Sequence, residues 1–192
     1  MTRRIASQLL LILWALSGTA AVQAQAQPME GPLAEARTHI VMKDWEKATR
    51  EVAKAEKKGL CKGAYCLALR ATIAERSGDS AKALEQARQA VPLFGPESGL
   101  DANLYNELGV IFYRQAKGNK ELLQLAEKAL RNADAAYTRD ASNIRFNLSE
   151  VLAALGRKSE AKAIMDKLEA EGILIDPHMS VLGNFQGVEI NN

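Results

Sequence analysis

Apolar and small residues recur three and four positions apart along most of this chain, a spacing that predicts amphipathic helices. The clearest stretch is GDSAKALEQARQAV, residues 78–91, and GRKSEAKAIMDKL, residues 156–168, echoes it. A weaker copy, KDWEKATREVAKA, occupies residues 43–55. Each copy has an Ala five residues after a turn position: the Ala residues are Ala48, Ala83 and Ala161, and the turn positions are Lys43, Gly78 and Gly156.

Pro and Gly cluster at residues 28–32, at 92–99 and after 172, and the sequence between is rich in Ala, Leu, Glu, Lys, Arg and Gln. These residues are strong helix formers. β-Branched residues are sparse and nowhere alternate over the length of a strand, so the sequence offers no source for a sheet. We therefore predict an all-α fold.

The spacing of the copies leaves room for a fourth helical pair. Ala48 and Ala83 stand 35 residues apart, whereas Ala83 and Ala161 stand 78 apart. The missing copy is LYNELGVIFYRQAKGNKELLQLAEKAL, residues 104–130, in which we expect about one extra residue near GNKELLQ. Each copy predicts a unit of helix, turn and helix, with the helices crossing at small residues, here Gly109, Ala83 and Ala161. One such pair cannot bury its apolar face alone, so the units are expected to stack.

This pattern resembles the tetratricopeptide repeat (TPR) family, whose unit of about 34 residues is a helix–turn–helix. The resemblance covers about residues 29–172 and is best in the third unit, where Tyr105, Leu108-Gly109 and Phe112 match the family motif. It implies a stack of about four units, an α-solenoid over residues 27–172. The alternative is an irregular helical bundle whose Ala content imitates the repeat.

The resemblance also implies that the first helices of successive units line a concave groove that binds extended or helical peptide segments. Asn is the informative residue type there, because its amide donates to and accepts from a bound backbone at once. The alternative is that Asn103 and Asn143 cap their helices and Phe146 belongs to the core. Only Arg76 and Arg114 could form a clamp for a terminal carboxylate, so that ligand is unsupported. The predicted partner-binding residues are Arg37, Tyr65, Arg76, Asn103, Asn106, Tyr113, Arg114, Asn143 and Asn147, with Asn106, Tyr113 and Arg114 at the centre.

Residues 1–26 read as an export signal: Arg3 and Arg4 precede an apolar run, and small residues follow at VQAQA. An uncleaved anchor and a twin-arginine signal are the alternatives. We expect a periplasmic or secreted protein without stable membrane insertion, because the run is too short to span a bilayer. Removing the signal takes two of 25 basic residues and none of 23 acidic ones, and a neutral chain argues against nucleic acid as a partner. Residues 173–192 are expected to form a short C-terminal cap, starting near Asp176-Pro177, and a loose tail.

Two cysteines, Cys61 and Cys66, are the only ones in the chain. In an exported protein they predict a structural disulfide, and Gly59 and Gly63 beside them permit a tight path. Free thiols are the main alternative. A thioredoxin-type redox pair or a haem attachment site needs a different spacing, and zinc needs further ligands that the sequence does not place nearby.

The sequence lacks the common signatures of hydrolases, nucleotide-binding enzymes and zinc proteases. We therefore expect no enzyme, no cofactor and no metal. The leading hypothesis is an exported adaptor or scaffold that binds protein or peptide segments, within an envelope assembly. The alternatives are a subunit that binds a small ligand or a cell-wall fragment, and a protein that self-assembles into a homo-oligomer.

Overall fold

A computed structural model describes residues 31–137 and 141–173 of the chain. Over these residues the fold is all-helical and contains no strand, which confirms the predicted class. The predicted export signal and the segment after Ile173, with its expected cap at Asp176-Pro177, lie outside the described residues. The helices are α1 (Pro32–Val41), α2 (Trp45–Lys57), α3 (Gly63–Arg76), α4 (Ser80–Ala90), α5 (Ala102–Ala116), α6 (Lys120–Ala136), α7 (Ser142–Ala154) and α8 (Lys158–Ala170), with short 3₁₀ helices η1 (Val91–Leu93) and η2 (Pro96–Ser98).

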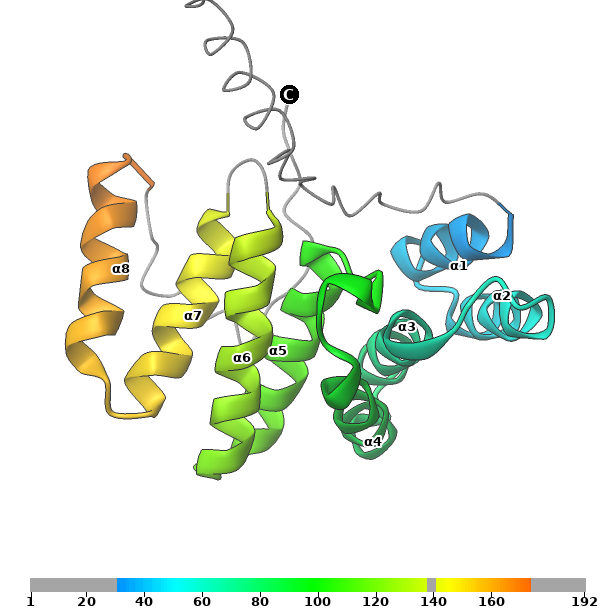
Figure 1. The fold of residues 1–192 in the computed structure, drawn as a ribbon, viewed down its shortest axis with the longest axis horizontal. Coiled ribbons are helices and arrows are strands. Elements are labelled where there is room, and N and C mark those ends of the chain that lie inside the picture. The colour runs from blue at the N-terminus through cyan, green and yellow to red at the C-terminus, as the bar shows by residue number, and fades with distance from the viewer. Residues whose placement is uncertain (1–30, 138–140, 174–192) are drawn as a thin grey trace, which may run out of the picture.

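Helices adjacent in the sequence pack against each other along the whole described chain (Figure 1). The units of the sequence pattern correspond to the pairs α1–α2, α3–α4, α5–α6 and α7–α8. Between units, α3 packs on α5 and α5 packs on α7, so the first helices of the last three units form a layer of their own. We call α3, α5 and α7 the odd-helix layer.

The repeated Gly has a structural cause at the turn inside the first, second and fourth units. Gly78 and Gly156 have φ of 93° and 82°, in the left-handed region that favours glycine. Lys43, which takes the Gly position in the first unit, has a φ of 58°. At each of these turns the next residue donates its backbone N–H to a carbonyl five residues earlier, which is the Schellman ending of a helix. The echo in the sequence is therefore a repeated helix-ending turn.

The residue after each turn position is the N-cap of the second helix. The side chains of Asp44, Asp79 and Asn119 each accept a hydrogen bond from a backbone N–H three residues later, which caps the helix N-terminus. α6 starts directly after Asn119, just as α4 starts directly after Asp79. Leu123 is the fourth residue after its N-cap, as Ala83 is. Gly109, however, stands ten residues before the N-cap Asn119, whereas the small residues at the same position of the second and fourth units, Ala71 and Ser149, stand eight before Asp79 and Arg157. The third unit is therefore longer before its second helix, by two residues rather than the one expected.

Small residues lie where the helices of a unit cross. A Cβ added to Gly109 would lie 2.6 Å from the Cγ of Leu130 and 3.4 Å from the carbonyl oxygen of Ala126, both on α6. This close approach confirms the prediction for Gly109. Ala83 and Ala161 are buried as well, and Phe112 is among the largest fully buried side chains.

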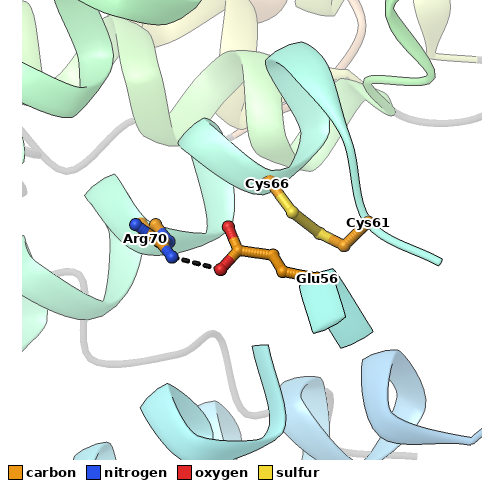
Figure 2. Close-up of a disulfide and its surroundings, with 4 residues drawn as sticks. All are labelled: Glu56, Cys61, Cys66 and Arg70. Atoms are coloured by element: carbon orange, nitrogen blue, oxygen red, sulfur yellow. Dashed lines mark hydrogen bonds and ion pairs between the residues drawn. A yellow bond between two sulfur atoms is a disulfide. The ribbon is translucent and has the colours of Figure 1, made fainter. Parts of the chain in front are cut away.

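Cys61 and Cys66 form the predicted disulfide between the loop after α2 and the first turns of α3 (Figure 2). Their Cα atoms lie 5.4 Å apart, and both residues are buried. Figure 2 also shows Glu56 of α2 paired with Arg70 of α3 beside the bridge. The disulfide and this ion pair join the first unit to the second, and the bridge is compatible with an oxidising compartment.

The linker between the second and third units folds back on α5. The hydroxyl of Tyr105 accepts a hydrogen bond from the backbone N–H of Gly95 at 3.3 Å and lies 3.0 Å from the hydroxyl of Ser98. The ring of Phe94 packs edge-on against Tyr105, with 5.1 Å between the ring centroids. Tyr105, read from the sequence as the aromatic start of the third unit, therefore holds the linker against the core.

Candidate binding surface on the odd-helix layer

Two ion pairs join the C-terminal end of α3 to α5 in the odd-helix layer. Arg114 of α5 binds Glu75 of α3, with 3.1 Å between Nη1 and Oε1, and Arg76 of α3 binds Glu107 of α5. Glu107 and Arg114 stand two helical turns apart and so share one face of α5. The Glu75 side chain is only 8% exposed, and its Oε2 has no hydrogen-bond partner, nor has the Nε of Arg114. The buried carboxylate of Glu75 and the half-buried guanidinium of Arg114 are therefore paired with each other, but each keeps one unpaired atom.

A buried amide pair joins α5 to α7. The Nδ2 of Asn147 donates to the Oδ1 of Asn106 at 2.9 Å, and both residues are about 95% buried. The Oδ1 of Asn147 has no partner. An unpaired buried acceptor costs free energy that a ligand able to donate a hydrogen bond would recover.

A small cavity lies next to this amide pair. Tyr113 of α5 and Glu150 of α7 line it and are half-buried, so it reaches solvent beside them. The Oε2 of Glu150 is shielded and has no partner. Burial raises the pKa of Glu150, and burial together with the negative charge of Glu150 raises the pKa of Tyr113. The full lining is Gly109, Val110, Tyr113, Leu130, Asn147, Glu150 and Val151.

Arg37 links α1, in the first unit, to the odd-helix layer through Tyr65 and Asp101. Its guanidinium lies 5.8 Å from the ring centroid of Tyr65 on α3 and pairs with Asp101, the residue that caps α5. Burial is the main cause that raises the pKa of Tyr65. Arg37 and Tyr65, predicted together from the pattern, are therefore in contact.

The structure brings some of the predicted partner-binding residues together and leaves others apart. Asn106 contacts Asn147, whereas Arg76 and Arg114 are each bound to a carboxylate of the neighbouring helix. Asn103 and Asn143 are exposed and do not cap their helices: the N-caps are Asp101 and Ala141, and the side chain of Asn143 accepts only from the next backbone N–H. The capping alternative was wrong, and Phe146 is half-buried rather than core.

Sequence reasoning missed the acidic partners of the predicted arginines. Glu75, Glu107 and Asp101 were not among the expected residues, although Glu75 stands directly before Arg76 and Glu107 stands on the Arg114 face of α5. An Arg and a Glu at positions that face neighbouring units would have been the signal. Arg76 and Arg114 are thus each paired with a carboxylate of the same chain.

In the described residues, no group of three or more His, Cys, Asp or Glu side chains is placed to hold a metal ion. His39 lies on α1, and His178 lies outside the described residues. None of the helices from α1 to α8 is long and apolar enough to cross a membrane.

Comparisons with known proteins give no relative for this chain: no family model, no curated protein and no solved structure matches it. The family resemblance therefore rests on the repeat pattern of the sequence.

Proposed function

We propose that this chain is an exported α-solenoid of the TPR type, and that its odd-helix layer binds an extended segment of another protein. The four pairs of helices, the repeated turn and the small residue at the α5–α6 crossing support the repeat architecture. The disulfide supports an oxidising compartment such as the periplasm or the extracellular space. An adaptor within an envelope assembly is the role that fits these features.

One observation carries the binding proposal. Six buried side-chain atoms in the described residues have no hydrogen-bond partner, and four of them lie on the odd-helix layer. Buried polar groups are normally paired, so unpaired ones concentrated on one layer indicate groups that a ligand completes. A peptide backbone offers both donors and acceptors, which suits the mixed set on this layer. The four atoms are Glu75 Oε2, Arg114 Nε, Asn147 Oδ1 and Glu150 Oε2.

The experiment is site-specific photo-crosslinking in the native envelope. The variant Tyr113→p-benzoylphenylalanine places the reactive group on the odd-helix layer, and the control Gln124→p-benzoylphenylalanine places it on an exposed position of α6. We expect a discrete crosslink at position 113 only, mapped by mass spectrometry to one segment of one protein. Equal labelling at both positions, or none at 113, would contradict the proposal.

A second step tests the mapped segment as a synthetic peptide. The binding variant replaces Asn103, Tyr113 and Asn143 by Ala, because these side chains keep contact with solvent. Asn106 and Arg114 are unsuitable, because their removal would leave Asn147 or Glu75 buried and unpaired and would confuse folding with binding. We expect the triple variant to keep the wild-type melting temperature within a few degrees and to lose most of its affinity for the peptide.

A further inference from the structure

The cavity between α5 and α7 has the chemistry of a receptor for one small cation. Two of the residues that line it each carry an oxygen acceptor that is shielded from solvent and has no donor: Asn147 Oδ1 and Glu150 Oε2. The amide nitrogen of Asn147 is already used on Asn106, so the free group on that side chain is the acceptor. The lining contains no Lys, Arg or His, and an ionised Glu150 therefore gives the cavity a negative charge.

No charge within the layer neutralises Glu150. Arg114, the basic residue next to Tyr113 in the sequence, is bound to Glu75 on the α3 side. A carboxylate oxygen that is shielded and unpaired favours a cationic partner strongly, because the low local dielectric strengthens the attraction. Burial already raises the pKa of Glu150, as expected for a carboxylate without such a partner.

The walls determine which cation fits. Val110, Leu130 and Val151 are apolar, and Tyr113 adds an aromatic ring whose face attracts cations. The region open to the centre of a water-sized sphere is about 10 Å³, about what one water molecule needs. An ammonium group is compact and of similar size, whereas a planar guanidinium is larger. Gly109 contributes a wall without a side chain, and Leu130 closes the space behind it.

We propose that this cavity is a subsite for a primary ammonium group, carried by a lysine side chain or a free amino terminus of the bound segment. The proposal deepens the proposed function, because it names the chemistry that the odd-helix layer selects. The ammonium would donate to Asn147 Oδ1 and Glu150 Oε2, with its methylene stem against Val110 and the Tyr113 ring. Arginine would be excluded by its size.

The test is an NMR titration of the isotope-labelled mature protein with butylammonium chloride, a mimic of the lysine side chain. We expect saturable shifts of the Asn147 side-chain amide and the Tyr113 ring in the millimolar range. Glu150→Gln should weaken this binding by about tenfold or more, because it removes a charge-assisted hydrogen bond. The control Glu169→Gln alters an exposed carboxylate on α8 and should change nothing. Circular dichroism establishes that both variants are folded.

Further probes distinguish a lysine side chain from a free amino terminus as the source of the ammonium group. Butylguanidinium should bind at least about tenfold more weakly than butylammonium, because it does not fit the cavity. An acetylated pentapeptide with one central lysine tests the side chain, pentaglycine amide tests the amino terminus, and acetylated pentaglycine amide is the blank. Binding of either of the first two, with none of the blank, supports the proposal and identifies the source.

The proposal is overturned if butylammonium produces no saturable shifts, if Glu150→Gln binds it as well as wild type does, or if butylguanidinium binds equally. These outcomes are independent of the crosslinking result. A specific crosslink at position 113 together with a failed titration would keep the binding function and reject the ammonium subsite. A successful titration without a crosslink would keep the subsite and reject the protein partner.

Discussion

Replacing Gly109 by Ala sets two effects of known size against each other. In a helix interior, Gly→Ala normally stabilises by about 1 kcal/mol, because Ala has the higher helix propensity. Here the new Cβ would lie 2.6 Å from Leu130 Cγ and 3.0 Å from Cδ2, whereas carbon atoms pack at about 3.5–4.0 Å. Cγ is the branch point of a side chain that is 1% exposed, so it cannot rotate into free space.

Overpacking of this kind costs about 1–3 kcal/mol. The net prediction for Gly109→Ala is therefore a loss of about 1 kcal/mol of unfolding free energy, opposite in sign to the propensity. Urea denaturation followed by circular dichroism measures it. Because the clash has one main partner, Leu130→Ala supplies the matched background, at its own cost of about 2–5 kcal/mol. In that background Gly109→Ala should stabilise, which corresponds to a coupling of about 1–3 kcal/mol between the two positions.

A coupling below about 0.5 kcal/mol would refute the reasoning, since distant and independent sites add to within that margin. Gly109→Ala would then stabilise by the same amount in both backgrounds. The close helix crossing, and the alignment of the units that depends on it, would both have to be abandoned.

Two further predictions concern the Cys61–Cys66 disulfide and the half-buried carboxylate of Glu150. Reducing the disulfide, or replacing Cys61 and Cys66 by Ser, should lower the unfolding free energy by about 2 kcal/mol, a small loss because the closed loop is short. Urea denaturation with and without reductant measures this loss, and equal midpoints would contradict the prediction. Burial raises the pKa of Glu150 in the folded state, so the folded protein holds the carboxyl proton more tightly than the unfolded chain does. Glu150 therefore destabilises the fold as pH rises past the ordinary Glu pKa of about 4.3. Glu150→Gln should therefore be more stable than wild type at neutral pH and equally stable below about pH 4, and a difference that does not change with pH would exclude this account.

The sequence predicted the helical pairs well because their signal is local. The turn requires a residue with positive φ followed by a helix cap, and both fall at fixed places in the chain, so even Lys43 could be assigned its position. The extra length of the third unit was visible in the same way, because the interval from Gly109 to the N-cap Asn119 is longer than the matching intervals of the second and fourth units.

The candidate site was harder to predict, because it depends on contacts between units. The sequence placed Arg76 and Arg114 on the first helices of their units, but it did not show that Glu107 and Glu75 pair with them. Asn106 and Asn147 were predicted individually, yet their pairing across α5 and α7 follows only from the stacking of the units. Which polar groups remain unpaired can be known only after the paired ones have been assigned.

The contact from Arg37 to Asp101 bears on how this chain unfolds. In a stack of repeats, each unit normally interacts only with its neighbours, so the end units can open one at a time. Arg37 belongs to the first unit, but its partner is the N-cap of α5 in the third. If the first unit opens, the cap of α5 loses its counter-charge, and α5 is the helix that carries Gly109 and Tyr113. The chain therefore has a direct link from the first unit to the third, beside the contact of Arg37 with Tyr65 of the second unit. Opening of the N-terminal end is thereby coupled to the helix at the centre of the proposed binding layer.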